Sequence, residues 1–523
     1  MKASSATAAN RILPHSLLGL SLANLCLLRG FAEAPPYLSG NSMALLRQPP
    51  STAYYAALLL NLAIIGAILG QSFRGAESGS RVARFASRAT LLIAGLIALN
   101  SMRRVLAYHF PVLTLTGFTP NLPAGGRYAA LGTMFALTCA ILYRGRSFLM
   151  PFFVGAVTIL SPLVPLSVGA TVWMIAQPPA GYAESSSASG ASTRDPKGTR
   201  VVIVLFDEFD YHLAFEAQRH GLRLPNLDRL REKAFFALDA RSPSDQTMVA
   251  VPSILTGRKF VEVKATGPRK IAMRTRGSQD WTDWADEANI FRDAKTKGLR
   301  PAIAGWYLPY CRIFSADLAA CSWWQASFVA FPSTNEWHRN MRNQLAAAIE
   351  APRVSPLPIS LQREADEEIL GELMPAAIRQ TGDPSLDLVF LHLPMSHAPY
   401  FYNRATSSFG PESPRSEGYW NGLALTDKCL GMILDAASAK AVKDRTVLML
   451  TSDHSYREPI NVGAKRDYRV PFIVRFPRDS RGVDYPASLE TTTLRRVVAA
   501  ILGDEVQTSS KLQGFLTARS TNK

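Results

Sequence analysis

The sequence of 523 residues predicts a polytopic α-helical membrane domain over residues 1–180, followed by an α/β domain with a mostly parallel sheet and helices on both faces over residues 200–523. Two observations support this division. Acidic residues are nearly absent from the first part, where long apolar stretches follow one another. In the second part charged residues return, and short Val/Ile/Leu-rich runs alternate with helical patterns, which is typical of a parallel sheet covered by helices.

Apolar segments of the first part are candidates for about five membrane-spanning helices, each of which needs ~20 residues. They lie at about 13–30, 53–72, 88–101, 127–143 and 148–178. The third segment is short, and polar positions interrupt the first. A cleavable signal peptide is the alternative for the first segment, but the repeated segments behind it favour a polytopic protein.

The basic residues of the short loops favour a cytoplasmic amino terminus. In that topology eight Lys and Arg residues face the cytoplasm and five face outward. An odd number of spans then places the second part outside the cytoplasm. If the third segment does not cross the bilayer, the second part lies inside instead.

Residues 181–199, GYAESSSASGASTRDPKGT, are rich in Ser, Gly and Ala and predict a flexible linker between the two parts. The formal net charge is +16, but no basic run with interleaved aromatic residues occurs, so the sequence does not indicate nucleic-acid binding. Much of the excess charge lies in the membrane loops. Attraction to an anionic membrane surface accounts for the rest.

The cysteines give one structural expectation. Cys26 and Cys139 lie in apolar segments, while Cys311, Cys321 and Cys429 lie in the second part. An oxidising compartment would permit a bridge between Cys311 and Cys321 that closes a short loop. The alternative is a pair of buried free thiols.

Two predicted strands of the second part end in polar residues that could share one metal ion. The run RVVIVLFDEFD, residues 200–210, ends in adjacent acids, and RTVLMLTSDHS, residues 445–455, ends with Asp453 and His454. Continuous Val/Ile/Leu runs are typical of strands buried on both faces, and ligands usually bind at the carboxyl ends of such strands. Further strand-like runs occur at 387–392 and 470–475, and a helical pattern, YWNGLALTDKCLGMILDAA, lies between them.

The order of these motifs resembles the alkaline phosphatase superfamily. A strand ending in Asp207–Glu208 is followed by LPNLDRL, a hydroxyl residue before VPSILTGR, HLPMSHAPY and TSDHS. The chain looks most like the membrane-bound sulfatase-like transferases, such as lipoteichoic acid synthases and lipid A phosphoethanolamine transferases. The resemblance implies a sulfatase-like catalytic domain, outside the cytoplasm, on a multi-pass protein of the bacterial inner (plasma) membrane.

Within this resemblance, two counts place the nucleophile on Thr247. Counting back from the sulfatase-like ending Leu255-Thr256-Gly257-Arg258 reaches Thr247, and so does counting four residues back from Val251–Pro252, as in the phosphoethanolamine transferases. No Cys or Ser stands there to become a formylglycine, so the resemblance implies attack by a threonine hydroxyl and a phosphothreonine intermediate. The alternative is that Thr247 only caps the helix MVAVPSIL.

The resemblance also implies the metal ligands. Asp453 and His454 match an Asp-His pair found at this strand end in the family; the alternative is a helix cap and a surface histidine. The first acidic position stays open: sulfatases place two acids there and the transferases a single Glu, so both Asp207 and Glu208 are candidates. Asp210, past the strand end, fits an amino-terminal cap of the following helix better.

Two carboxylates, one imidazole and the Thr247 oxygen would suit Zn²⁺, with Mn²⁺ as the alternative.

For the substrate, His397 in HLPMSHAPY resembles a histidine that contacts the phosphoryl group in the transferases, and it could also protonate a leaving alkoxide. His392 is more typical of a satisfied core residue. Arg312, among aromatic residues, and Arg469, at a place where the transferases often have a histidine, are weaker candidates for substrate binding.

Three functions follow as hypotheses. The first is transfer of a phosphoethanolamine or phosphoglycerol group from a membrane phospholipid donor to an envelope lipid or glycan acceptor. The second is a hydrolase of phosphate diesters or sulfate esters that uses water as the acceptor. The third is a membrane scaffold whose metal site has decayed, which the assembled motifs disfavour.

Overall fold

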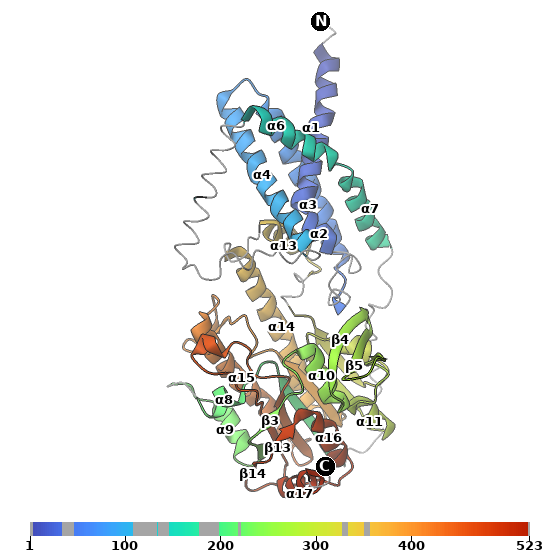
Figure 1. Cartoon of the computed structure of the whole chain (residues 1–523), viewed down its shortest axis with the longest axis vertical. Coiled ribbons are helices and arrows are strands. Elements are labelled where there is room, and N and C mark those ends of the chain that lie inside the picture. The colour runs from blue at the N-terminus through green and yellow to red at the C-terminus, as the bar shows by residue number, and fades with distance from the viewer. Residues whose placement is uncertain are drawn as a thin grey trace. The chain divides into compact units, whose positions relative to one another are not determined.

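The computed structural model describes residues 4–33, 46–107, 133, 146–176, 198–217, 221–326, 333–349 and 356–520. The chain forms two compact units (Figure 1). The first contains Met1–Ala44, Gln48–Ala180 and Phe331–Leu361, and the second contains Leu45–Arg47, Gly181–Ala330 and Gln362–Lys523. The predicted linker 181–199 lies outside the described residues except at its last two positions, and so does nearly all of the fourth apolar segment, 127–143.

The first unit is helical. Its elements are α1 (Ser4–Cys26), α2 (Leu28–Glu33), α3 (Thr52–Ala76), α4 (Arg81–Ala107), α6 (Arg146–Ile159), α7 (Leu163–Ala176) and α13 (Trp337–Ile349). Three stretches of the described residues are long and apolar enough to cross a membrane: Thr52–Ala76, Arg81–Leu106 and Met150–Ala176. They match the second, third and fifth predicted segments. The first predicted segment folds as α1 and α2, which are not among these three.

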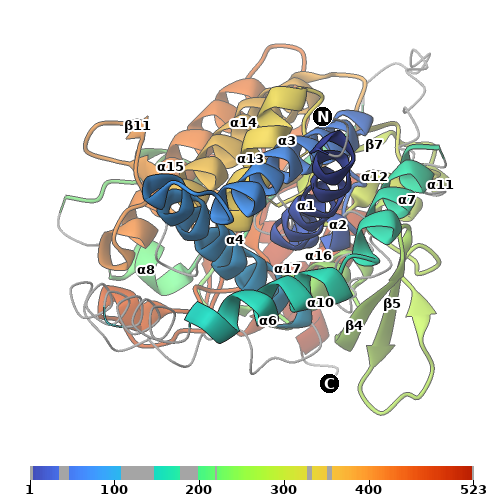
Figure 2. The same cartoon turned by 90° about the horizontal axis from the view of Figure 1, so that it is seen from above.

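Glycines let α1 approach α3 closely, and Figure 2 shows the two helices next to each other. A Cβ atom on Gly19 would lie 2.3 Å from the carbonyl oxygen of Gly66 and 2.4 Å from the nitrogen of Gly70. Small residues at such contacts bring helix backbones together and are typical of packing between membrane helices. Buried Leu22, Leu62 and Leu91 belong to the apolar core shared by α1, α3 and α4.

The second unit is built on an eight-stranded sheet with the order β14-β2-β13-β12-β1-β9-β7-β8. Strands β12, β1, β9, β7 and β8 are parallel, and β13 runs antiparallel to both β12 and β2. The strands are β14 (Val483–Tyr485), β2 (Phe235–Ala237), β13 (Phe472–Arg475), β12 (Thr446–Ser452), β1 (Arg200–Phe206), β9 (Leu388–Leu393), β7 (Pro301–Trp306) and β8 (Ala320–Trp324). The predicted mostly parallel sheet is therefore confirmed. Its central strands β1 and β12 lie at the two Val/Ile/Leu-rich runs identified in the sequence.

Helices cover both faces of this sheet. On one face, even-numbered residues of β1 such as Val204 pack in a core with Leu230, Leu373 and Leu430, which come from α9 (Pro225–Arg231), α14 (Pro356–Gly382) and α15 (Arg415–Ala437). On the other face, α16 (Leu494–Leu502) contacts β1, and α11 (Ile290–Thr296) contacts β7. The remaining helices are α8 (Tyr211–Phe215), α10 (Thr247–Thr256), α12 (Tyr310–Ile313) and α17 (Ser509–Ser520).

Smaller elements surround the main sheet. A three-stranded sheet contains β4 (Phe260–Gly267), β5 (Lys270–Thr275) and β6 (Thr282–Asp283), and two short pairs join β3 (Ala240–Arg241) to β15 (Leu489–Glu490) and β10 (Tyr402–Asn403) to β11 (Ser408–Phe409).

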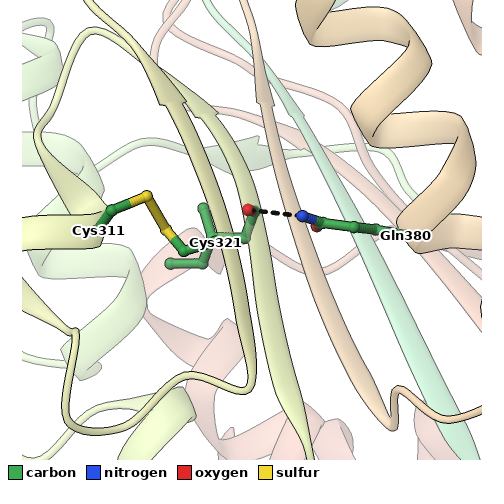
Figure 3. The surroundings of a disulfide bond; sticks show 4 residues. Cys311, Cys321 and Gln380 are labelled. Carbon is green, nitrogen blue, oxygen red and sulfur yellow. Dashed lines mark hydrogen bonds between the residues drawn. A yellow bond between two sulfur atoms is a disulfide. The ribbon is translucent and has the colours of Figure 1, made fainter. Parts of the chain in front are cut away.

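A disulfide joins Cys311 of α12 to Cys321 of β8, as the sequence allowed (Figure 3). Their Cα atoms are 5.5 Å apart. Beside it, the Gln380 amide of α14 donates a hydrogen bond of 3.0 Å to the carbonyl of Ile303 in β7. Among the described residues, the free cysteines are Cys26 and Cys429, both buried; Cys139 lies outside the described residues. The disulfide and this hydrogen bond tie the edge of the sheet to its covering helices.

Candidate active site

The register of the two central strands brings the predicted polar residues together. Strand β1 pairs with β12 in parallel, with Phe206 opposite Ser452. The residues that follow, Asp207 and Asp453, therefore leave the sheet side by side at its carboxyl edge. Serine side chains fix the turn after β1: Ser452 Oγ donates to the carbonyl of Phe206 at 2.8 Å, and Ser396 Oγ donates to the carbonyl of Asp207 at 2.7 Å.

Asp207, Asp453 and His454 form a buried cluster of metal-ligand type. The Nε2 atom of His454 lies 3.2 Å from Asp453 Oδ2 and 3.7 Å from Asp207 Oδ1. One potential ligand atom from each residue lies within 4.8 Å of the other two. A cation with ligand bonds of about 2 Å separates its tetrahedral ligands by about 3–4 Å, which these distances match.

The hydrogen bonding of the two carboxylates also fits a cation. Oδ1 of Asp453 accepts from the backbone nitrogens of His454 and Glu208, at 2.7 and 3.1 Å. Asp207 Oδ1 and Asp453 Oδ2 are buried without a hydrogen-bond donor among the described residues. Buried carboxylate oxygens are normally satisfied, so these two oxygens, which face each other and His454, suit a shared metal ion.

Electrostatics in the cluster point the same way. Burial raises the pKa of Asp207 well above its ordinary value, and the neighbouring Asp453 and Glu208 raise it further. Burial opposes ionisation of Asp453 too, but His454, His392 and the Thr247 hydroxyl outweigh it and lower that pKa. Two buried acids in contact cannot both ionise cheaply without a cation between them, and a divalent ion would remove this cost.

Thr247 stands at the first residue of α10 and faces the cluster. Its Oγ1 lies 3.3 Å from His454 Nε2. The cap residue of this helix is Gln246, whose side chain makes no capping bond. Thr247 is therefore not the helix cap, which was the alternative reading of the sequence. Two nearby serine hydroxyls are engaged elsewhere: Ser253 donates within α10 to the carbonyl of Val249 at 2.7 Å, and Ser242 donates to the Asp453 carbonyl.

Glu208 turns away from the cluster. Its backbone has a φ of 58°, and its carboxylate is paired with the guanidinium of Arg457. The Glu208 carbonyl accepts a hydrogen bond of 2.8 Å from the hydroxyl of Tyr419, which holds this turn in place. Of the two candidate acids at the end of β1, the structure thus brings Asp207 to Asp453 and His454. It places Glu208 beside the guanidinium of Arg457.

Arg457 also reaches His397. Its Nη2 lies 3.3 Å from His397 Nε2, so a neutral imidazole can accept this hydrogen bond. Burial lowers the pKa of His397, which keeps the ring neutral. The Arg457 side chain is 41% exposed, whereas its partner Glu208 is 5% exposed. Arg457 was missed in the sequence because nothing in SDHSYREP sets it apart from a surface arginine.

A pocket opens at His397. Its lining includes Trp306, Tyr400 and Phe409, and its carboxylate comes from Asp366 of α14. The ring centroids of Trp306 and His397 are 5.4 Å apart. An aromatic pocket with a few polar groups is typical of small-molecule sites. It could hold the organic part of a substrate whose charged group lies at Arg457 and the acidic cluster.

His392 lies in the core of β9, as expected, but only one of its ring nitrogens is satisfied. Its Nδ1 lies 2.7 Å from the Tyr310 hydroxyl, its Nε2 is buried without a hydrogen-bond partner among the described residues, and burial lowers its pKa to about 4. Asp210 caps α8: its Oδ1 accepts from the backbone nitrogen of Leu213 at 3.0 Å. Its Oδ2 accepts from the nitrogen of Tyr456 at 3.3 Å, which links the turns after β1 and β12.

The structure does not bring Arg312 or Arg469 to the cluster. Arg312 is buried, 4.8 Å from the ring of Trp323, and donates to the carbonyl of Leu46. Arg469 donates to Glu216 at 2.7 Å and to Asp467 at 2.6 Å. These two acids and His212 form a second group of possible metal ligands, but Arg469 already neutralises it and lowers the pKa of Glu216 to about 2.

Comparison with known proteins places this site in a family. The sulfatase family model matches residues 199–502. Among solved structures, Ps i-CgsB in complex with k-i-k-neocarrahexaose is similar, at 15% identity and a TM-score of 0.42, covering 59% of this chain and 73% of that one. The lipoteichoic acid synthase LtaP from Listeria monocytogenes has 14% identity, a TM-score of 0.40, and coverage of 60% and 76%. PsFucS1 sulfatase from Pseudoalteromonas sp. has 14% identity and a TM-score of 0.40, and the match covers 59% of this chain and 69% of that one. No curated protein matches the chain.

Proposed function

Since the chain belongs to the sulfatase family, we propose that it is a metal-dependent transferase that moves a phosphoethanolamine or phosphoglycerol group from a membrane phospholipid to an envelope lipid or glycan. The observation that carries this proposal is the position of the Thr247 hydroxyl, 3.3 Å from His454 Nε2, at the edge of a buried cluster with Asp207 and Asp453. A hydroxyl at a metal-ligand cluster is the arrangement that nucleophilic attack on phosphorus needs.

The reaction would have two steps. In the first, the Thr247 oxygen bonds to phosphorus, the bond from phosphorus to the diacylglycerol oxygen breaks, and a proton goes to the leaving alkoxide. In the second, an acceptor hydroxyl attacks the phosphothreonine, and the Thr247 oxygen leaves with a proton. The amino end of α10 supplies a partial positive charge where negative charge develops.

Asp207, Asp453, His454 and Thr247 would hold the metal, with Zn²⁺ as our first choice and Mn²⁺ as the alternative. When bound, such an ion lowers the pKa of a coordinated hydroxyl and stabilises charge on phosphoryl oxygens. The ligand set has one nitrogen and three oxygen donors, and this number of protein ligands suits a zinc site.

Arg457 and His397 would bind the phosphoryl group beside the cluster. Arg457 has an exposed edge and lies between Glu208 and His397, so it can donate a charge-assisted hydrogen bond to a phosphate oxygen. His397 could carry the proton to the leaving oxygen, as its neutral form can accept a proton and pass it on.

Between the two donor headgroups, the pocket favours phosphoethanolamine. Its lining includes one acid, Asp366, whereas burial lowers the pKa of the other ionisable lining residue beside the cluster, His397, and favours its neutral form. A carboxylate among aromatic rings such as Trp306 and Tyr400 attracts an ammonium group, through charge and through cation-π contact. A glycerol headgroup would use neither feature.

We place the catalytic domain outside the cytoplasm. The adjoining ends of α3 and α4 carry Arg74, Arg81, Arg84 and Arg88, which favour the cytoplasmic side, so α3 begins outside. Near the carboxyl end of α7, Met174 packs against Tyr55 at the start of α3, so the chain leaves the last helix on that outer side. The Cys311–Cys321 disulfide agrees with an oxidising compartment.

Trapping of the intermediate tests the proposal. Full-length protein in vesicles of phosphatidylethanolamine and phosphatidylglycerol should acquire the mass of one headgroup phosphate on Thr247 by peptide mass spectrometry. Thr247→Ala should fold, lack this mass and lose turnover, whereas Thr247→Ser should keep both in part. Full transfer activity by Thr247→Ala would refute the proposed function.

Hydrolysis is the second candidate, because the matching family model is that of sulfatases. In this case water would replace the acceptor hydroxyl and the substrate would be a phosphate diester or a sulfate ester. Turnover of a soluble chromogenic diester, with and without Zn²⁺, separates the two functions. Rapid turnover that does not depend on an acceptor would favour hydrolysis.

A further inference from the structure

Helix α13 buries three amide side chains, along with Ala346 and Ala348, and exposes three large apolar residues beside His338 and Arg342, which is unusual for a helix at a water-exposed surface. The buried polar side chains are Asn340, Asn343 and Gln344, and the exposed apolar ones are Trp337 (57%), Leu345 (37%) and Ile349 (50%). In water such a helix would leave its apolar side unsatisfied. The same pattern suits a helix whose outer side faces lipid.

The polar side of α13 is locked to α3, one of the helices able to cross a membrane. Asn61 of α3, 2% exposed, donates to Gln344 Oε1 at 2.9 Å and to the carbonyl of Met341 at 3.2 Å. Gln344 in turn donates to the carbonyl of Tyr54 at 2.9 Å. Paired amides between helices are how membrane proteins satisfy polar groups away from water.

A second contact fixes the start of this segment at the start of α3. Ser51, the cap of α3, donates through Oγ to the carbonyl of Thr334 at 2.6 Å, and through its backbone nitrogen to Ser333 Oγ at 3.0 Å. Residues 333–344 therefore dock along the first part of α3, from Ser51 to Asn61, which is about 15 Å of helix.

The position of α13 within its unit agrees with a membrane interface. It contacts α2 and α4 as well as α3, and Figure 1 shows it across one end of this bundle. Its 13 residues extend for ~20 Å, less than the ~30 Å of a bilayer core, so it does not span. Trp337 and the basic residues Arg339 and Arg342 are of the types enriched where helices meet lipid headgroups.

We propose that α13 is a second membrane anchor, supplied from within the catalytic half of the sequence. It lies in the outer interface of the bilayer, with Leu345 and Ile349 among the upper acyl chains and Arg342 at the headgroups. The connection from Trp324, at the end of β8, to Ser333 is nine residues and can extend by ~30 Å at most. The anchor thus limits how far the edge of the catalytic sheet can move from the lipids, which the longer linker at 181–199 alone would not do.

Collision accessibility of spin labels tests the anchor in the full-length protein, reconstituted in phosphatidylethanolamine and phosphatidylglycerol vesicles. Labels at Leu345→Cys and Ile349→Cys should collide with oxygen, which concentrates in lipid, and should be protected several-fold from a water-soluble nickel complex. Ile460→Cys is the matched control, because Ile460 is 81% exposed in the second unit and should show the opposite behaviour. Among the described residues the free cysteines Cys26 and Cys429 are buried, and the unsubstituted protein reports the background labelling of all native cysteines.

If the labels at 345 and 349 are as open to the nickel complex as the label at 460, the anchor does not exist. This readout uses no turnover, so it is independent of the proposed function. Because all three substituted side chains are exposed, the variants should fold, and the Cys311–Cys321 bridge remains intact to show that they do.

Discussion

Thr247 Oγ1 lies 3.3 Å from His454 Nε2, although the two residues are 207 positions apart in the sequence. Two local features produce this contact. Strand β12 ends at Ser452, so that Asp453 and His454 leave the sheet at its carboxyl edge, and α10 begins at Thr247 above that edge. The proposed nucleophile and the proposed ligand cluster are thus brought together by the fold and not by the local sequence.

Removal of either buried cluster carboxylate should abolish metal binding. Asp207→Asn and Asp453→Asn keep the shape of the side chain but lose the charge that a divalent ion requires. Wild-type protein should be stabilised by about 2.7 kcal/mol at a zinc concentration 100 times its dissociation constant, and both variants should show no such gain. Thermal unfolding with and without zinc, together with metal analysis, measures this.

Glu208→Gln is the control, because the structure pairs Glu208 with Arg457 and not with the cluster. This variant should retain its metal. Loss of metal in Glu208→Gln, and retention in Asp207→Asn, would show that the other acid at the end of β1 is the ligand.

Arg457 should act on substrate binding more than on metal binding. Arg457→Gln removes a cation beside His397, and loss of one charged hydrogen bond to phosphate would lower kcat/KM by about 10- to 100-fold. Metal content should stay unchanged. Arg457→Lys should recover only part of the activity, since a lysine cannot contact Glu208 and a phosphate oxygen with the same geometry. A loss confined to metal content would contradict this role.

The pocket acid should set the choice of headgroup. Asp366→Asn removes the negative charge that favours an ammonium group, so the preference for phosphatidylethanolamine over phosphatidylglycerol should fall by about tenfold. Competition between the two lipids in mixed vesicles, read by the mass trapped on Thr247, measures the ratio. A wild-type preference for phosphatidylglycerol would overturn the assignment of the headgroup while leaving transfer itself intact.

Much of the framework could be predicted because it depends on local pattern. The apolar runs of β1 and β12 mark buried strands wherever they occur, and polar residues directly after them, such as Asp207 and Asp453, must stand at the sheet edge. Asp207 and Asp453 then come together if β1 and β12 are neighbours in the sheet. A parallel α/β sheet makes this pairing possible, although the strands are far apart in the sequence.

The remaining details depend on contacts that no local pattern encodes. The φ of 58° at Glu208 turns its carboxylate towards Arg457, and a single residue in this conformation cannot be read from neighbours of ordinary composition. Arg469 looked available for substrate, but its partner Glu216 lies 253 positions away. No local pattern indicates that Gln344 is buried and bonded to Asn61, 283 positions away.

A buried arginine should be important for stability. Arg200, fully buried, donates from Nη2, Nη1 and Nε to the carbonyls of Gln380, Thr381 and Leu386, at 2.7, 2.6 and 2.7 Å, near the carboxyl end of α14. Arg200→Met leaves these acceptors without their donor, so unfolding should be easier by about 3–5 kcal/mol. Arg229→Met, at a half-exposed ion pair with Asp435, is the matched control and should cost at most about 1 kcal/mol. Equal effects on the unfolding midpoint would contradict the inference.

Asp210 should make stability depend on pH. Burial raises its pKa from 3.8 to about 6. A carboxyl whose pKa is higher in the folded protein than in the unfolded chain contributes stability that is complete below about pH 3.8 and is lost as the pH rises through about 6. The loss amounts to about 3 kcal/mol for a shift of this size.

Asp210→Asn removes the titrating group but keeps a cap for α8. In this variant the asparagine has one acceptor oxygen in place of two, so the hydrogen bond from the backbone nitrogen of Leu213 or of Tyr456 is weakened at every pH. Only the change of stability with pH therefore tests the titration of Asp210. The variant should therefore gain stability relative to the wild type between pH 4 and pH 7. Unfolding midpoints across this range measure the difference, and parallel curves for the two proteins would show that Asp210 does not titrate as its burial requires.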